Sequence, residues 1–171
     1  GITVCAYTRS IGAIQADMKR FDRSAILETA TAMPDRKADN DAISYLEGAK
    51  KQFNSVGGVM ECLVEGRPAG VGDPVFEKLD ANLAKAVMSI GAVKAVEIGD
   101  GYQVSSRLGT ENNDAYYMEN GKVAKATNHA GGILGGISDG SPIVIRAHVK
   151  PTPSIYTTQQ TVNKSGEDIH V

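Results

Sequence analysis

Apolar side chains recur at every second position in residues 143–150, which is the period of a β-strand with one buried face. The set expected to face the core comprises Ile143, Ile145, Ala147 and Val149, and the opposite set comprises Val144, Arg146, His148 and Lys150. The second set forms a cationic row along the strand. On spacing alone, a solvated sheet face is the simplest interpretation of that row.

Apolar residues at steps of three and four predict a first amphipathic helix over residues 41–55. Asn40 or Asp41 is the expected N-cap, and Gly57 and Gly58 are the expected end. The apolar stripe of this helix comprises Ala42, Ile43, Leu46, Ala49 and Phe53. The residues before it, 33–39, are mostly polar and are predicted to form a connector.

A second amphipathic helix is predicted to start at Asp73-Pro74, where an acceptor at the cap precedes a proline at the first helical position. Gly91 marks its expected end. Its buried stripe comprises Phe76, Leu79, Leu83, Val87 and Ile90.

Shorter apolar runs predict further strands, at residues 1–9, 59–65, 92–98 and 102–105. Residues 116–118 and 122–124 flank Asn120-Gly121, a pair typical of a tight β-hairpin. Residues 109–114 are rich in turn formers and are predicted to be an irregular loop. Hairpin signals and short polar turns argue against a doubly wound parallel sheet. The sequence therefore predicts an α+β fold, a layered sandwich of mostly antiparallel sheet packed on helices.

The length of 171 residues fits one domain, residues 1–171. The chain opens on the apolar run Gly1-Ile2-Thr3 and stops soon after a polar turn at residues 163–168. Natural termini usually fray into polar residues. We therefore expect an incomplete portion of a longer chain.

The charge balance excludes some partners. There are 18 Lys and Arg against 20 Asp and Glu, so the formal net charge of -2 gives no reason to expect nucleic acid or a membrane. No apolar run approaches the ~20 residues that span a bilayer, and no signal peptide opens the chain. The expected compartment is the cytoplasm.

Cysteines and histidines give little support for a metal site. Cys5 and Cys62 each lie in an apolar run without ligand spacing, so buried free thiols are expected. The three histidines, His129, His148 and His170, have no carboxylate or cysteine at metal-ligand spacing, and no metal is expected.

Candidate chemistry is concentrated in a glycine-rich stretch, residues 128–136, and in the turn Lys150-Pro151-Thr152-Pro153-Ser154. Glycines permit close main-chain approach to a flat or phosphorylated ligand, and the turn sets a cation beside two hydroxyls. We expect Gly135 and Lys150 to form one wall of a single pocket. The alternative is that the glycines only turn the chain and Lys-Pro ends a strand, and local chemistry alone favours it.

His129, beside the glycines, is a candidate proton donor or hydrogen-bond partner. The alternative role, which we weight more heavily, is a loop histidine that orders the turn through its ring nitrogens.

Four separated blocks, in this order, resemble the chorismate synthase family. They are GDPVFEKLD at residues 72–80, AVMSIGAVKAVEIGDG at 86–101, NHAGGILGGIS at 128–138 and KPTPSI at 150–155. The resemblance is clear from about residue 57 to residue 166 and weaker before that. It implies that the chain carries part of the chorismate synthase fold.

The resemblance also implies a function. Such enzymes are carbon-oxygen lyases of the shikimate pathway, in aromatic amino acid biosynthesis, and convert 5-enolpyruvylshikimate 3-phosphate to chorismate and phosphate. They need reduced FMN and are similar in forming homotetramers. The family's FMN-contacting positions correspond in this chain to Gly91, Ala92, Gly135, Lys150, Pro151, Thr152, Pro153 and Ser154. Relatives often carry Asn where this chain has Gly91.

The family's two catalytic histidines belong to Gly-Glu-Ser-His-Gly and Arg-Pro-Gly-His segments, and neither segment occurs in these residues. The Arg-Ser-Ser-Ala-Arg and Arg-His-Asp-Pro segments are also missing. We therefore expect no catalytic residue in this chain and no turnover by it alone. The alternative function is a non-catalytic core or assembly fragment of the same family.

Overall fold

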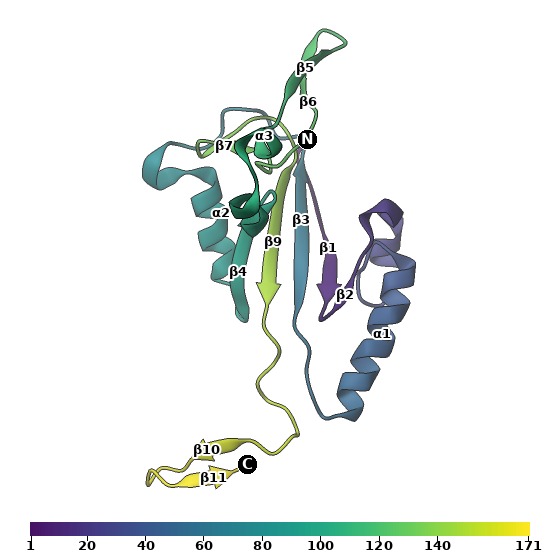
Figure 1. The fold of residues 1–171 in the computed structure, drawn as a ribbon, viewed down its shortest axis with the longest axis vertical. Coiled ribbons are helices and arrows are strands. Elements are labelled where there is room, and N and C mark those ends of the chain that lie inside the picture. The colour runs from purple at the N-terminus through teal and green to yellow at the C-terminus, as the bar shows by residue number, and fades with distance from the viewer.

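The computed structural model describes residues 1–171 and centres on a five-stranded antiparallel sheet (Figure 1). Its strand order is β2-β1-β3-β9-β4. The strands are β1 (Thr3–Ile11), β2 (Ile14–Gln15), β3 (Gly58–Glu65), β4 (Val93–Ile98) and β9 (Ile143–Val149). Helix α1 (Arg36–Lys51) stands beside the β2 edge, and helix α2 (Leu79–Met88) lies beside β4. The α+β prediction is confirmed.

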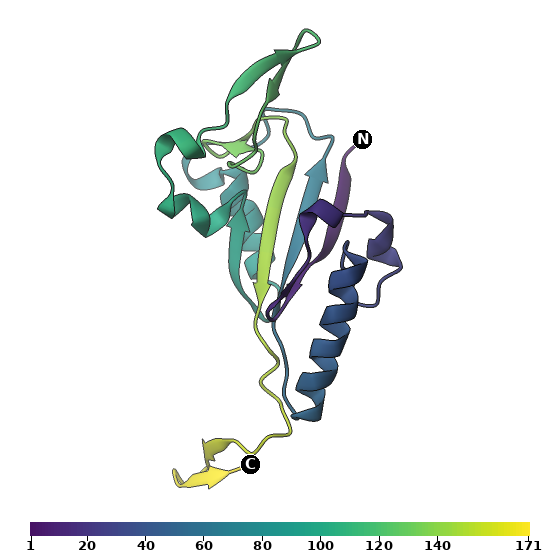
Figure 2. The same ribbon diagram turned by 45° about the vertical axis from the view of Figure 1, so that its right-hand side comes forward.

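Two hairpins extend from opposite ends of this body (Figures 1 and 2). One pairs β5 (Tyr116–Glu119) with β6 (Lys122–Lys125) through Asn120-Gly121, as the sequence predicts. The other pairs β10 (Gln160–Val162) with β11 (Asp168–His170) near the C-terminus.

The β9 residues that were predicted to face the core are buried at the start of the strand. Ile143 and Ile145 are only 2% and 6% exposed, and they pack with Ile133 and with Leu79 and Leu83 of α2. The opposite face differs from the solvated row expected from spacing. Arg146 sits directly across from Glu61 on β3, pairs with its carboxylate, and donates a 2.7 Å hydrogen bond to the Gly99 carbonyl. Within that row only Lys150 is exposed.

Helix α2 starts later than Asp73-Pro74. Pro74 is extended, with ψ 165, and a 3₁₀ turn at Val75–Glu77 precedes the α-helix. The physical reason is docking of this segment on the glycine stretch: the Leu79 N–H donates to the Gly136 carbonyl at 2.8 Å. Phe76 and Ile90, expected in the buried stripe, are 88% and 59% exposed. The helix ends at Met88 rather than at Gly91.

Helix α1 is displaced toward the N-terminus of its predicted range. Its N-cap is Asp35, whose side chain accepts from the Lys37 N–H, so Asn40 and Asp41 are not caps. The buried face is made by Ala38 and Ala42 against Ala16 and Met33. The segment predicted as a polar connector therefore contains a helix cap and the first helical turn.

Four further local expectations are wrong. Phe53 lies beyond the end of α1, in a left-handed conformation, and is 62% exposed, so it is not part of a buried stripe. Residues 101–106 form a 3₁₀ helix, not a strand, and residues 109–112 form the short helix α3 (Gly109–Asn112), not an irregular loop. Cys5 and Cys62 are free but only partly buried, whereas buried thiols were expected.

None of the helices has the length and apolar content that crossing a bilayer requires.

Asp35 ties the start of α1 to the rest of the molecule. Its side chain is 1% exposed and pairs with Arg20 at 2.6 Å. Hydrogen bonding from Arg20 outweighs burial and holds the pKa of this carboxyl well below its usual range. A carboxyl whose pKa is lowered on folding stabilises the fold above its unfolded pKa, and the contribution is lost as pH falls.

We expect Asp35→Ala to lower the free energy of unfolding by about 2 kcal/mol at pH 7, because a cap and a half-exposed ion pair are lost together. Asp41→Ala, at an exposed position of the same helix, is the matched control and should change it by less than about 0.5 kcal/mol. Urea unfolding measures both. The Asp35 effect should shrink below about pH 4. Equal effects of the two substitutions would contradict the assignment of the cap.

Candidate functional site

The glycine stretch folds as a loop followed by a miniature hairpin. Strands β7 (Ile133–Leu134) and β8 (Ile137–Ser138) pair across Gly135-Gly136, which adopt φ 59 and 85. Positive φ at both central residues is typical of the tightest hairpin turn. Gly135 is exposed, and a Cβ built on it would meet nothing within 4 Å. Its backbone conformation, not crowding, is what favours glycine there.

Gly131 and Gly132 serve a different purpose. A Cβ at Gly131 would lie 2.3 Å from the Gly99 nitrogen, and one at Gly132 would lie 2.6 Å from the Pro142 carbonyl oxygen. These two glycines let the loop press against the end of β4 and the start of β9. The close backbone approach at Gly131 and Gly132 is therefore a contact within the protein and not an approach to a ligand. For these two glycines the structure agrees with the alternative interpretation of the glycine stretch.

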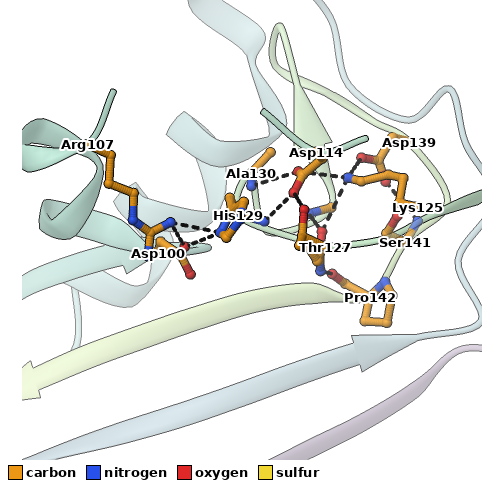
Figure 3. Close-up of polar contacts among 12 residues, drawn as sticks. Asp100, Arg107, Asp114, Lys125, Thr127, His129, Ala130, Asp139, Ser141 and Pro142 are labelled. Carbon is orange, nitrogen blue, oxygen red and sulfur yellow. Dashed lines mark hydrogen bonds and ion pairs between the residues drawn. The ribbon is translucent and has the colours of Figure 1, made fainter. Parts of the chain in front are cut away.

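A buried ion cluster organises this loop (Figure 3). Lys125, at the end of β6, places its ammonium 2.6 Å from the Asp139 carboxylate and 3.2 Å from the Asp114 carboxylate. The three side chains are 6%, 9% and 5% exposed, respectively. Such groups are almost never this buried unless they are paired.

Asp114 also binds the loop directly. Its carboxylate accepts from the Thr127 hydroxyl and the His129 N–H, both at 2.7 Å, and from the Ala130 N–H at 3.1 Å. Burial opposes ionisation of Asp114, but these hydrogen bonds and Lys125 outweigh it and lower its pKa. Burial opposes the charge of Lys125 as well, yet its two carboxylate partners raise its pKa. Both groups are therefore charged at neutral pH.

His129 lies at the edge of this network (Figure 3). Its Nδ1 is 2.5 Å from the Asp100 carboxylate and 2.8 Å from the Arg107 guanidinium, which also donates to Asp100. Burial opposes ionisation of Asp100, and hydrogen bonds from His129 and Arg107 lower its pKa nonetheless. These contacts at Nδ1 fix the orientation of the His129 ring.

The remaining candidate positions gather at the other end of β9. The Lys150 N–H donates to the Ala92 carbonyl at 2.9 Å, so the turn after α2 and the Lys-Pro turn are adjacent. Ala92 adopts φ 70, unusual for a residue with a side chain. Gly91 is exposed, and a Cβ there would meet nothing within 4 Å, so the position has room for a larger side chain.

Residues 151–154 continue along the loop that follows α1. The Ser55 hydroxyl donates to the Thr152 carbonyl at 2.6 Å, and the Pro153 carbonyl accepts from Gln159 at 3.3 Å. A cavity of about 320 Å³ opens between the two segments. Its wall is formed by Lys50, Phe53, Asn54, Ser55, Ser154, Ile155 and Tyr156. Two aromatic rings and an ammonium suit a flat, anionic ligand.

The expectation that Gly135 and Lys150 form one wall of a single pocket is wrong within this chain. Gly135 lies in the turn beside the start of β9, and Lys150 follows its last residue. Seven strand residues separate those ends by roughly 23 Å. The sequence-predicted positions therefore divide into Gly91, Ala92 and Lys150–Ser154 at one end, and Gly135 with His129 at the other.

Sequence reasoning missed Lys125, Asp114, Asp139, Asp100 and Arg107. The available signal was a lysine that ends the second strand of the predicted hairpin and lies in the sequence between two aspartates, Asp114 and Asp139. No group of three or more His, Cys, Asp and Glu side chains converges as a metal site.

Comparison with known proteins gives one consistent result. The family model described as chorismate synthase matches residues 1–171. The chorismate synthase of Agathobacter rectalis is 56% identical over 171 residues, covering 100% of this chain and 47% of the relative. That of Methanococcoides burtonii is 47% identical over 167 residues, covering 95% of this chain and 45% of the relative. The chain thus spans about half the length of the curated relatives it matches.

A solved structure agrees. A crystal structure of chorismate synthase superposes with a TM-score of 0.81 at 30% sequence identity, covering 88% of this chain and 50% of the other.

We expect Lys125→Met to lower the free energy of unfolding by about 3 kcal/mol at pH 7, because it leaves two buried carboxylates without their cation. Lys122→Met, exposed on the same strand, should change it by less than about 0.5 kcal/mol. The pKa values of Asp114 and Asp139 are lowered on folding. The difference in free energy of unfolding between the wild type and Lys125→Met should therefore become smaller below about pH 4. Urea unfolding at both pH values measures this. A pH-independent difference would show that packing, not charge, is lost.

Proposed function

The chain belongs to the chorismate synthase family, and from this membership we propose that the complete protein converts 5-enolpyruvylshikimate 3-phosphate to chorismate with reduced FMN as cofactor. The fold agrees with that of a solved chorismate synthase structure. The observation that carries the cofactor assignment is the Lys150 N–H to Ala92 carbonyl contact, which joins two segments that the family resemblance assigns to FMN. Because the chain spans about half of its relatives, the reaction is proposed for the complete protein.

The proposed reaction is an anti-1,4-elimination. The allylic C–O bond breaks and phosphate leaves with its electron pair, a ring C–H loses its proton, and a new double bond completes the conjugated ring of chorismate. There is no net redox change. Reduced FMN, when bound, supplies transient electron density that eases loss of the phosphate.

The residues of this chain that fit FMN are those at the Ala92 end. The ammonium of Lys150 and the hydroxyls of Thr152 and Ser154 are exposed beside a main chain held rigid by Pro151 and Pro153. Their role is to bind an anionic, planar group and to fix its orientation. Gly135 is remote from them in the same chain, so a contact between Gly135 and the same FMN requires another subunit.

His129 is better suited to ordering the loop than to transferring protons at the Lys150 end. Its ring is held by Asp100 and its backbone N–H by Asp114, and it lies on the Gly135 side of β9. We propose that the proton-transfer groups of the complete protein lie outside these 171 residues. A homotetramer and a cytoplasmic location are proposed on family grounds.

The competing proposal is a non-catalytic core or assembly fragment that keeps the fold without turnover. We treat these 171 residues as one domain of a longer protein. Both proposals predict that this chain by itself forms no chorismate. They differ for the complete protein, which forms chorismate only under the first.

The test compares the 171-residue chain with the complete protein, both supplied with reduced FMN and 5-enolpyruvylshikimate 3-phosphate. We expect chorismate from the complete protein only, because general acid–base catalysis needs its proton-transfer groups within hydrogen-bond reach. In the complete protein, Lys150→Gln should weaken FMN binding by about tenfold or more through loss of a charge-assisted hydrogen bond. Lys164→Gln, in the exposed turn of the C-terminal hairpin, is the control.

Flavin fluorescence quenching measures binding, and absorbance measures chorismate. Turnover by the 171-residue chain at a rate near that of the complete protein would refute the assignment of catalysis to residues outside it. Equal FMN affinity of the Lys150→Gln and Lys164→Gln variants would refute the assignment of the cofactor end.

A further inference from the structure

The β5–β6 hairpin projects away from the sheet in both views (Figures 1 and 2). Its two strands pair only with each other. Four large apolar side chains on it are open to solvent: Tyr116 is 56% exposed, Tyr117 46%, Met118 66% and Val123 69%. A two-stranded hairpin is marginally stable by itself, and exposed apolar side chains grouped on one such hairpin indicate an interaction surface.

The register of the hairpin defines which backbone groups are free. In an antiparallel pair, hydrogen-bonded and non-hydrogen-bonded residue pairs alternate. The Ala126 N–H donates to the Ala115 carbonyl at 2.9 Å, which sets the phase of that alternation. Tyr117 then bonds inward to β6, whereas Tyr116 and Met118 direct their N–H and C=O groups outward. The outer edge of β5 therefore offers two unpaired residues with one between them.

The two edges of the hairpin differ in charge. The β6 edge carries Lys122 and Lys125, and lysines are a common means of protecting an edge strand from pairing. The β5 edge has no charge from Tyr116 to Met118, and its only charged residue is Glu119 beside the turn. Of the two edges, β5 is the one open to another strand.

We propose that β5 pairs antiparallel with β5 of a second copy of this chain, giving a four-stranded sheet across a two-fold axis that passes beside Tyr117. Tyr116 then lies opposite Met118 of the second copy, and Met118 opposite Tyr116 of the second copy. Each pair exchanges two main-chain hydrogen bonds. Because successive residues alternate faces, Tyr116, Met118 and Val123 of both copies gather on one face of the new sheet.

The second copy fits because the edge is complementary to itself. The same three residues supply both sides, the unpaired groups of one meet those of the other, and no like charges face each other. The alternative pairing through β6, whose outward-directed residues are Val123 and Lys125, would set Lys125 opposite Val123 or opposite its own counterpart in the second copy. The base of the arm is also fixed, because Lys125 is held by Asp114 and Asp139. This surface gives a specific contact to the homo-oligomer proposed above, and its test does not depend on catalysis.

The substitution Tyr117→Cys in the complete protein tests whether the two-fold axis passes beside residue 117. In the proposed sheet, Tyr117 and its counterpart form a non-hydrogen-bonded pair, with Cα atoms about 4.5 Å apart, within the range that a disulfide spans. We expect mild oxidation to give a covalent dimer that a reductant reverses. Val123→Cys, more exposed but on the far strand, is the matched control and should stay uncrosslinked, as should the wild type.

A second measurement guards against misfolding of the cysteine variant. Tyr117→Lys places two ammonium groups beside the axis, and we expect it to halve the sedimenting mass relative to wild type, while Val123→Lys leaves the mass unchanged. Crosslinking of Val123→Cys as readily as Tyr117→Cys would overturn the proposal. So would an unchanged mass for Tyr117→Lys, which would indicate that the hairpin packs on the rest of its own chain.

Discussion

The arrangement of the glycine-rich end depends on one buried cation. Lys125 lies between Asp139 and Asp114, and the same Asp114 carboxylate collects the hydroxyl of Thr127 and the N–H groups of His129 and Ala130. Removing charges from water is costly, and the cost is recovered only when each lone pair and proton finds a partner. Here the partners come from the short α3 region, the hairpin and the turn before β9. One cluster thereby fixes three segments that are separate in the sequence.

From that end, β9 and α2 act as rigid spacers. The glycine turn is docked on the start of α2 through Gly136, and α2 and β9 both run to the end where Ala92 meets Lys150. The buried face of β9 packs on α2, so the two ends keep a constant separation. The glycines divide accordingly: Gly131 and Gly132 permit internal contacts, whereas Gly135 faces open space. Of the positions attributed to FMN by resemblance, those around Lys150 form the continuous group.

Local patterns predicted much of the sheet, because a period of two and an Asn-Gly pair are encoded by neighbouring residues. They predicted β9, β3, the β5–β6 hairpin and the α+β class. They missed the start of α1, since Ala38 and Ala42 are too small to stand out and Asp35 resembles a linker residue until Arg20 is seen beside it. They also missed the Lys125 cluster, which requires pairs far apart in sequence. The proximity expected for Gly135 and Lys150 failed because an extended strand lies between them.

Hydrogen exchange of the complete protein with and without FMN tests the central claim, that the cofactor binds where the Lys150 turn meets Ala92. We expect FMN to slow exchange at the amides of Ala92, Thr152, Ser154 and Ile155, because a bound flavin excludes water from both segments. Protection confined to residues 131–136, with none in residues 150–155, would contradict it.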